Sequence, residues 1–237
     1  TDIMNDIRYN IMPKIQAKYP TVSASYEGQN REAFKLINSL SSAGIPILIL
    51  IYITIAFTFR SFSQPILLFC LMPVSLIGVA WGHWIHGFPV NILSLLGVIA
   101  LIGIMVNDGL VLIGKFNNNL KQNFNFNEGL IDAGKSRFRA IFLTTATTVA
   151  GLTPLLLEKS RQAQWLKPMA ISVSYGIAFA TILTLILLPI FISLNNDLKV
   201  IFKWLVSGNY PDKEFVERAI IEKKEEQKMD QMNNPEN

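Results

Sequence analysis

Charged residues and cysteines are scarce in this sequence. Only 16% of its 237 residues are Asp, Glu, Lys or Arg, whereas soluble domains carry about a quarter. Cys70 is the single cysteine, which excludes an internal disulfide. The sequence also lacks a phosphate-binding glycine loop, a Ser-His-Asp arrangement, and the CxxC and HExxH patterns. We therefore expect no enzymatic activity and no cofactor.

Two histidines, His83 and His86, have the i, i+3 spacing that a metal site on a helix would use. No third ligand lies near them in the sequence, and structural metal sites need more ligands than two. We interpret them as polar residues at a membrane interface, next to Trp81 and Trp84. We expect no bound metal.

The apolar residues are clustered in long segments of a chain that is 51% hydrophobic with a mean hydropathy of +0.36. Each segment is near the roughly 20 residues that a helix needs to cross the hydrocarbon core. Only helices and closed barrels satisfy their backbone in lipid, so the pattern predicts an all-α membrane protein with five transmembrane helices. The five predicted spans are Leu40–Phe59, Pro65–Trp84, Asn91–Ile113, Ala140–Leu157 and Met169–Leu194.

The chain divides into three predicted parts, 1–40, 41–195 and 196–237. The first part reads as a helix over 2–18, a strand over 22–26 and a second helix from residue 30, which is a small α/β piece unable to bury its own core. We expect it to be the end of a larger domain, and the chain to be the C-terminal fragment of a larger protein. In the tail, 212–228 predicts a solvated helix; between spans, 128–135 predicts a short helix on the membrane surface.

Basic residues predict the orientation of the spans. The connection Lys115–Arg139, the turn at Arg60 and the tail after Leu194 are rich in Lys and Arg, and all fall on one side. The positive-inside rule makes that side the cytoplasm. We therefore expect residues 1–40 outside the cytoplasm and the C-terminus inside. The net charge of +4 then reflects topology and does not indicate nucleic-acid binding.

Asp108 is the one acidic residue within the predicted spans. An ionised Asp at the bilayer centre costs at least roughly 2.5–3.5 kcal/mol, so such residues are usually functional. One interpretation is proton transfer; the other is a permanently protonated Asp that makes a packing hydrogen bond. We favour the first.

Small residues form a stripe on the same predicted helix, at Gly97, Ala100 and Gly103, followed by Asn107. Such a stripe permits close approach of another helix. We therefore expect Asn107 and Asp108 to lie beside a tight helix contact. In the next span, Thr144 and Thr148 share one face; they either bond back to their own helix or meet Asp108 and relay a proton.

Four segments in this order resemble the C-terminal half of resistance-nodulation-division (RND) efflux pumps, of the hydrophobic and amphiphilic drug exporter type. The similarity spans about residues 1–195. The segments are RSFSQP at 60–65, GVIALIGIMVND at 97–108, RFRAI at 137–141 and LTTATTVAGLTP at 143–154.

The resemblance implies the last five helices of a twelve-helix, proton-driven pump in the inner membrane, with residues 1–40 ending its periplasmic porter domain. It implies a homotrimer that works with the remaining N-terminal part of the transporter, a periplasmic adaptor and an outer-membrane channel. Asn107 stands where many members have a lysine that faces two aspartates of another helix. Thr144 matches a relay threonine, and Arg137 matches a functional arginine at the cytoplasmic entrance.

Two alternatives stay open. One is a related proton-driven machine, such as a protein-export accessory or a lipid exporter. The other is a non-transporting membrane scaffold made as a separate short protein. The sequence by itself names no substrate.

Overall fold

The computed structural model describes residues 6–19, 29–208 and 211–233. The chain forms two compact units, Thr1–Ile47 and Leu48–Asn237, which are taken in turn below. Within the described ranges every regular element is a helix. This confirms the helical class predicted from the sequence. The predicted strand over 22–26 lies outside the described residues.

The first unit contains a π-helix, η1 (Ile7–Ile11), which continues into α2 (Met12–Lys18). Helix α2 buries none of its side chains. The helix expected over 2–18 is therefore present from Ile7 onward in the described residues. Helix α3 (Gln29–Phe59) begins in this unit and ends in the second.

Four helices of the second unit are long and apolar enough to cross a membrane. They are α4 (Ser63–His86), α5 (Ile92–Lys121), α6 (Phe126–Leu157) and α7 (Arg161–Ser207). In α3 the apolar part is Gly44–Phe59, which is shorter than a full span. Four of the five predicted spans are thus found in helices of sufficient length, and the first stays a prediction.

Local sequence explains where these helices begin and end. Asn91 accepts hydrogen bonds from two backbone N–H groups at the start of α5, and Ser94 bonds back to it, which forms a capping box. Ser160 caps α7 in a similar way. Gly87 and Gly208 end α4 and α7 with positive φ angles of 65° and 72°, a conformation that glycine adopts without strain.

Two helices extend beyond the spans that are predicted within them. The expected surface helix 128–135 and the span that was expected from Ala140 form one continuous helix, α6, because residues 136–139 contain no proline or turn signal. Helix α7 starts eight residues before Met169 and runs well past Leu194 to Ser207. The first part of the predicted tail is therefore a continuation of the last span.

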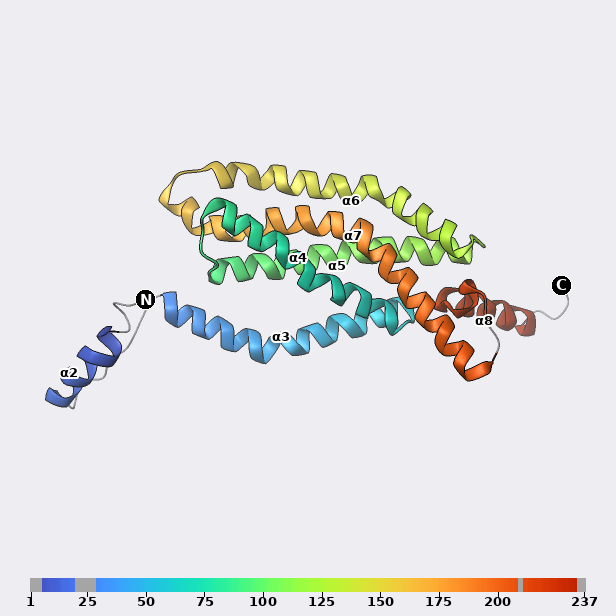
Figure 1. Cartoon of the computed structure of the whole chain (residues 1–237), viewed down its shortest axis with the longest axis horizontal. Helices are drawn as coiled ribbons and strands as arrows, with labels where there is room; N and C mark the ends of the chain where they lie inside the picture. Colours follow the sequence, from blue (N-terminus) through green and yellow to red (C-terminus); the bar gives the residue numbers. More distant parts are fainter. Residues whose placement is uncertain (1–5, 20–28, 209–210, 234–237) are drawn as a thin grey trace. The chain divides into compact units, whose positions relative to one another are not determined.

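Helix α7 is the centre of the bundle and packs against α4, α5 and α6, as Figure 1 shows. The helices approach closely at glycines. A Cβ atom on Gly78 would lie 2.4 Å from the Cβ of Phe179, and one on Gly176 would lie 2.4 Å from a methyl group of Leu101. Leucine, isoleucine and phenylalanine side chains from α3 to α8 fill the core between them.

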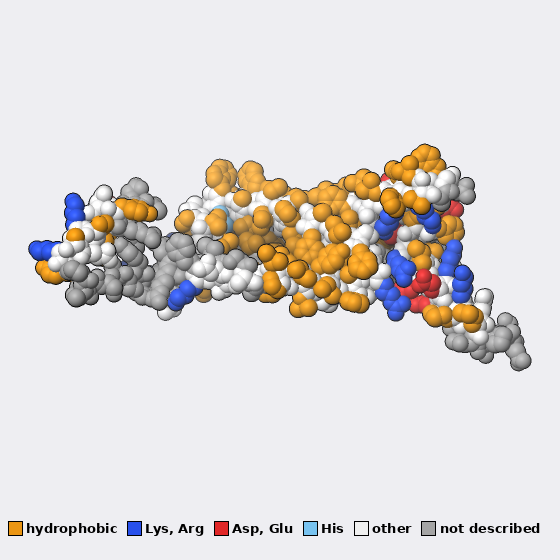
Figure 2. Space-filling model, turned by 90° about the horizontal axis from the view of Figure 1, so that it is seen from below, with side chains coloured by type: hydrophobic (Ala, Val, Ile, Leu, Met, Phe, Trp, Pro, Cys, Tyr) orange, Lys and Arg blue, Asp and Glu red, His pale blue; other side chains and the backbone are white. Residues whose placement is uncertain are grey.

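The tail folds back as η2 (Lys213–Val216) and α8 (Arg218–Asn233), and α8 packs against α5. Figure 2 shows that Lys, Arg, Asp and Glu side chains gather at the end of the apolar surface where α8 lies. The predicted helix in the tail is present, but part of it is packed rather than solvated. The membrane-facing surface therefore ends in a polar layer.

Candidate functional site

Asp108 is buried inside the helix bundle, with 6% of its surface exposed. It follows Leu101 and Met105 and precedes Leu112 at spacings of three and four residues, so all four lie on one face of α5. The other three are almost fully buried. No hydrogen bond or ion pair from the described residues reaches the Asp108 carboxylate.

The helices beside Asp108 are in close contact. A Cβ atom on the next residue, Gly109, would lie 2.2 Å from a methyl group of Leu68 on α4 and 3.7 Å from one of Leu188 on α7. Polar atoms that are buried without partners destabilise a fold by about 1–3 kcal/mol or more. The Asp108 carboxyl group therefore lies in an apolar, tightly packed region. Helix packing alone would not require an acid there.

Asn107 lies on the other side of α5. It is exposed, as are Ala100 and Gly103, and a Cβ atom on Gly103 would meet nothing within 4 Å. Of the predicted small-residue stripe, Gly97 alone packs closely, since its Cβ atom would lie 2.7 Å from the carbonyl oxygen of Met169. The packing roles of Ala100 and Gly103 stay predictions, because the face that they share with Asn107 is uncovered in this chain.

Thr144 does not face the bundle. It is exposed, and its hydroxyl donates to the carbonyl of Ala140 at 2.9 Å. Its neighbour Thr145 is buried and hydrogen-bonds to Thr181 of α7. The sequence analysis missed Thr145, although its spacing of four residues from the buried Ile141 marks the inner face of α6. The relay role of Thr144 stays a prediction.

Arg137 is half-buried on α6, and its Nε atom is enclosed without a hydrogen-bond partner among the described residues. The rings of Phe138 and Phe142 stack on each other on the exposed side of the same helix. The structure does not bring Arg137 into contact with Asp108. Its role at an entrance stays a prediction.

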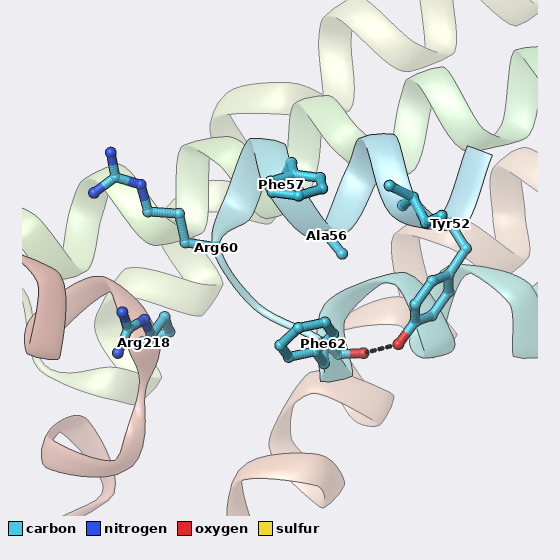
Figure 3. Close-up of a pocket in the computed structure, with 7 residues that line it drawn as sticks. Tyr52, Ala56, Phe57, Arg60, Phe62 and Arg218 are labelled. Atoms are coloured by element: carbon cyan, nitrogen blue, oxygen red, sulfur yellow. Dashed lines mark hydrogen bonds between the residues drawn. The ribbon is translucent and has the colours of Figure 1, made fainter. Parts of the chain in front are cut away.

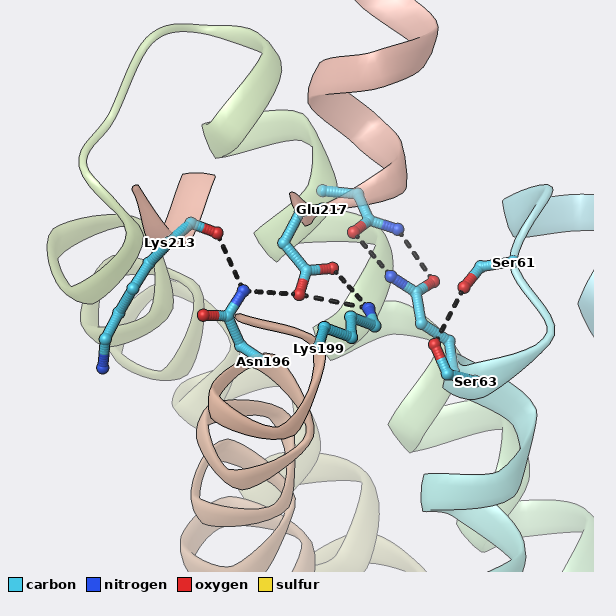
Figure 4. Close-up of polar contacts among 8 residues, drawn as sticks. Ser61, Ser63, Asn196, Lys199, Lys213 and Glu217 are labelled. Carbon is cyan, nitrogen blue, oxygen red and sulfur yellow. Dashed lines mark hydrogen bonds and ion pairs between the residues drawn. The ribbon is translucent and has the colours of Figure 1, made fainter. Parts of the chain in front are cut away.

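A polar layer at the α8 end of the bundle was not foreseen from the sequence. Glu217, which is 2% exposed, accepts hydrogen bonds from Asn196 at 2.8 Å and from Lys199 at 3.0 Å (Figure 4). Gln64 and Asn117 also exchange hydrogen bonds through their amides, at 2.9 and 3.1 Å. These contacts fix the tail and the ends of α4, α5 and α7 together.

Two glutamates outside the apolar spans have pKa values below the ordinary value for glutamate. The hydrogen bond from Lys121 lowers the pKa of Glu222, and the nearby charge of Arg60 adds to this effect. The pKa of Glu158 is lowered because the backbone N–H groups of Ser160 and Lys159 donate to its carboxylate. Both groups therefore favour their charged forms.

The two histidines make structural hydrogen bonds at the other end of α4. His83 is buried and lies 3.0 Å from the Phe88 carbonyl and 3.0 Å from the Ser172 hydroxyl, while His86 contacts the Tyr175 hydroxyl. Within the part of the chain that the structure describes, no group of three residues could hold a metal ion. We assign these side chains to helix packing.

Comparison with known proteins gives the family. Residues 4–195 match the AcrB/AcrD/AcrF family, which covers most of this chain. The chain belongs to this family. Its members are RND efflux transporters, so the resemblance to RND pumps is confirmed, whereas the drug exporter type and the status of the chain as a fragment are not.

Curated relatives of the family include pumps with different cargo. The chain is 27% identical over 170 residues to the swarming motility protein SwrC of Bacillus subtilis, covering 71% of this chain and 16% of that protein. It is 27% identical over 143 residues to the cobalt-zinc-cadmium resistance protein CzcA of Cupriavidus metallidurans, covering 60% and 14%. It is 23% identical over 171 residues to the multidrug resistance protein MdtC of Proteus mirabilis, covering 72% and 17%. The chain thus spans about a sixth of their length.

The fold of the family is also found in a solved structure. A crystal structure of a heavy metal efflux pump superimposes with a TM-score of 0.63 at 23% identity, covering 78% of this chain and 19% of that one. At this identity the likeness establishes the helical fold. It assigns no cargo to this chain.

Proposed function

We propose that this chain is the C-terminal part of an inner-membrane RND pump that exports drug-like or amphiphilic compounds in exchange for protons. The observation that carries the proposal is Asp108, a carboxyl group buried without a partner on the packed face of α5. Gaining and losing a proton changes the cost of burying this group, and such a change lets helices repack. That repacking would drive the remainder of the transporter.

The uncovered face of α5 supports the same proposal. Ala100, Gly103 and Asn107 present small side chains and one amide, which suit close contact with another membrane helix. We propose that this helix belongs to the remaining N-terminal part of the transporter and carries the partner acids. Asn107 would then hydrogen-bond to it, with Thr144 and Arg137 as further members of the proton path.

We further propose the arrangement of the whole pump. Residues 1–40 lie in the periplasm and the C-terminus in the cytoplasm, as the distribution of basic residues predicts. The pump is a homotrimer that works with a periplasmic adaptor and an outer-membrane channel. The drug site lies outside this chain, so the proposal names no substrate residue.

The test compares Asp108→Asn with wild type in cells that express the full-length protein at matched membrane abundance. Asparagine keeps the volume of Asp108 and removes the proton site, so we expect loss of resistance to amphiphilic drugs. Asp197→Asn is the control, because Asp197 is half-exposed and pairs with Lys213 at the surface. Resistance that survives Asp108→Asn would assign Asp108 to packing and would contradict the proposal.

A divalent metal ion is the second candidate cargo. The similarity to the cobalt-zinc-cadmium resistance protein CzcA and the fold likeness to a heavy metal efflux pump favour it. The same strains, challenged with cobalt, zinc and cadmium salts, distinguish the two. Protection against the metals alone would replace the drug-like cargo and leave the role of Asp108 in place.

A further inference from the structure

We propose that the pocket beside the turn after α3 binds an anionic phospholipid, with its acyl chain on the aromatic wall and its phosphate at Arg60 and Arg218. This site lies in the second unit, away from Asp108, and the inference goes beyond the proposed transport function. Figure 3 shows the pocket and the residues that line it.

The wall of the pocket is apolar. It has a volume of about 400 Å³ and is lined on this side by Tyr52, Ile53, Ala56, Phe57 and Phe62. Phe57 and Phe62 are 78% and 79% exposed, although each ring would be stabilised by burial. The hydroxyl of Tyr52 donates to the carbonyl of Phe62 at 2.8 Å, which ties the turn to the helix. The apolar wall is therefore already formed, and a bound molecule would bury its exposed rings.

Arg60 occupies a strained position in the turn. The N–H of Ser61 bonds to the carbonyl of Ala56, and the N–H of Arg60 to that of Phe57, which is the pattern of a Schellman helix end. Arg60 has a φ of 48°, in the left-handed region where glycine is favoured and other residues are strained. Glycine would adopt this backbone conformation with less strain. We therefore attribute the arginine at this position to its guanidinium group.

Cations exceed anions at the rim of the pocket. Arg60 pairs with Glu222 at 2.8 Å, Lys121 pairs with the same carboxylate at 2.8 Å, and Arg218 lies 3.5 Å from Glu225. Of these residues only Arg60 and Arg218 line the pocket, whereas Lys121 and Glu222 line a neighbouring hollow, so both charged groups of the pocket lining are cations. A guanidinium has five N–H donors, so each arginine keeps donors for a further anion. Planar guanidinium groups match the geometry of phosphate oxygens.

The position of the pocket selects a lipid over a soluble anion. The apolar part of α3 ends at Phe59 and charge begins at the next residue, Arg60. The pocket therefore joins an apolar wall to a cationic rim at the edge of the hydrocarbon layer. A phospholipid supplies both an acyl chain and a phosphate there, and each basic residue at the membrane surface strengthens the attraction of an anionic headgroup.

The experiment measures lipid binding to the purified full-length protein in detergent by native mass spectrometry. Phosphatidylglycerol and phosphatidylcholine with identical acyl chains are the probes. We expect the double variant Arg60→Gln, Arg218→Gln to lose a preference for phosphatidylglycerol on the order of tenfold. Arg139→Gln is the matched control, because Arg139 is exposed and does not line the pocket.

Three further measurements test the charge of the arginines, the apolar wall and the need for acyl chains. The double variant Arg60→Lys, Arg218→Lys keeps both charges and is expected to keep most of the preference, which excludes loss through misfolding. Phe57→Ala is expected to weaken binding of both lipids while the preference stays. Glycerol 3-phosphate, which lacks acyl chains, is expected not to compete. Equal loss in Arg139→Gln, an unchanged preference in the double Gln variant, unaltered binding in Phe57→Ala, or competition by glycerol phosphate would overturn the proposal.

Discussion

Asn107 and Asp108 are adjacent in the sequence but lie on different faces of α5. Asp108 points into the bundle of this chain, whereas Asn107 is exposed beside Ala100 and Gly103. A protonation change at Asp108 would act on the packing of α5 with its neighbours in this chain. A contact at Asn107 would act on the exposed face of α5. The face of α5 with Asp108 therefore contacts helices of this chain, and the face with Asn107 is exposed to a different partner.

The small-residue stripe gives a matched pair of variants in one helix. Gly97→Ala would place a Cβ atom 2.7 Å from the Met169 carbonyl oxygen, whereas Gly103→Ala meets open space. We expect Gly97→Ala to destabilise the packing within this chain by about 1–3 kcal/mol through overpacking. Gly103→Ala leaves that packing unchanged, so any loss of stability in this variant reports the proposed contact with another membrane helix. Thermal unfolding followed by near-ultraviolet circular dichroism compares them. Wild-type stability in Gly97→Ala would contradict the close packing at Gly97.

The buried pair Thr145 and Thr181 suits a double-mutant cycle. Replacing either by valine leaves one hydroxyl unpaired, with an expected loss of about 0.6–2 kcal/mol, as found for hydrogen bonds between membrane helices. Replacing both is expected to cost less than the sum of the single losses. Thr144→Val is the control, since its hydroxyl is exposed and bonds within its own helix. Strictly additive losses would show that the two hydroxyls do not interact.

A second use of Thr144→Val separates stability from transport. If Thr144 relays protons as the resemblance implies, this variant is expected to keep its unfolding temperature and to lose drug resistance. Unchanged resistance would remove Thr144 from the proposed proton path.

The lowered pKa of Glu222 predicts how the packing of α8 against α5 depends on pH. The pKa of Glu222 is lowered by the hydrogen bond from Lys121, so its charged form stabilises the folded state. This contribution is complete above the ordinary glutamate pKa of about 4.3 and is lost as the pH falls through the lower folded value. Hydrogen exchange in α8 is expected to increase below that pH in wild type and to lose this step in Glu222→Gln. In Glu225→Gln, whose weaker pair with Arg218 is exposed, the step should persist.

Glu217 anchors the tail to α7. Its replacement by alanine removes the acceptor for Asn196 and Lys199, with an expected loss of about 1–3 kcal/mol, typical of hydrogen bonds that involve charged groups. Limited proteolysis of α8 measures this, with Glu226→Ala in the exposed part of the same helix as control. Equal cleavage rates in the two variants would refute the anchoring role.

The sequence predicted the helical class and four apolar helices, because charge is scarce in apolar segments. The same scarcity makes Asp108 conspicuous, and its role stays a prediction. The sequence did not predict that Asn107 and Asp108 separate. The stripe of small residues suggested one shared contact face, whereas neighbouring side chains on a helix diverge by about 100° and only the packed neighbours decide which is covered.

The buried tail could not be predicted for a different reason. Alternating acids and bases in 212–228 are typical of a solvated helix, and Glu217 carries no local sign of burial. Its partners, Asn196 and Lys199, lie about 20 residues earlier on α7 and become neighbours only when the chain turns at Gly208. The composition of a short sequence segment does not reveal hydrogen bonds to residues that lie outside it.

The length of α7 has a mechanical consequence. With 47 residues and a rise of about 1.5 Å per residue, it measures roughly 70 Å, more than twice the hydrocarbon thickness of about 30 Å. The residues after Leu194 extend about 20 Å past the predicted span and carry the anchored tail. This extension is tied at two places: Glu217 binds the tail to α7 through Asn196 and Lys199, and Glu222 binds α8 to Lys121 of α5, so a tilt of α7 against α5 would strain both contacts.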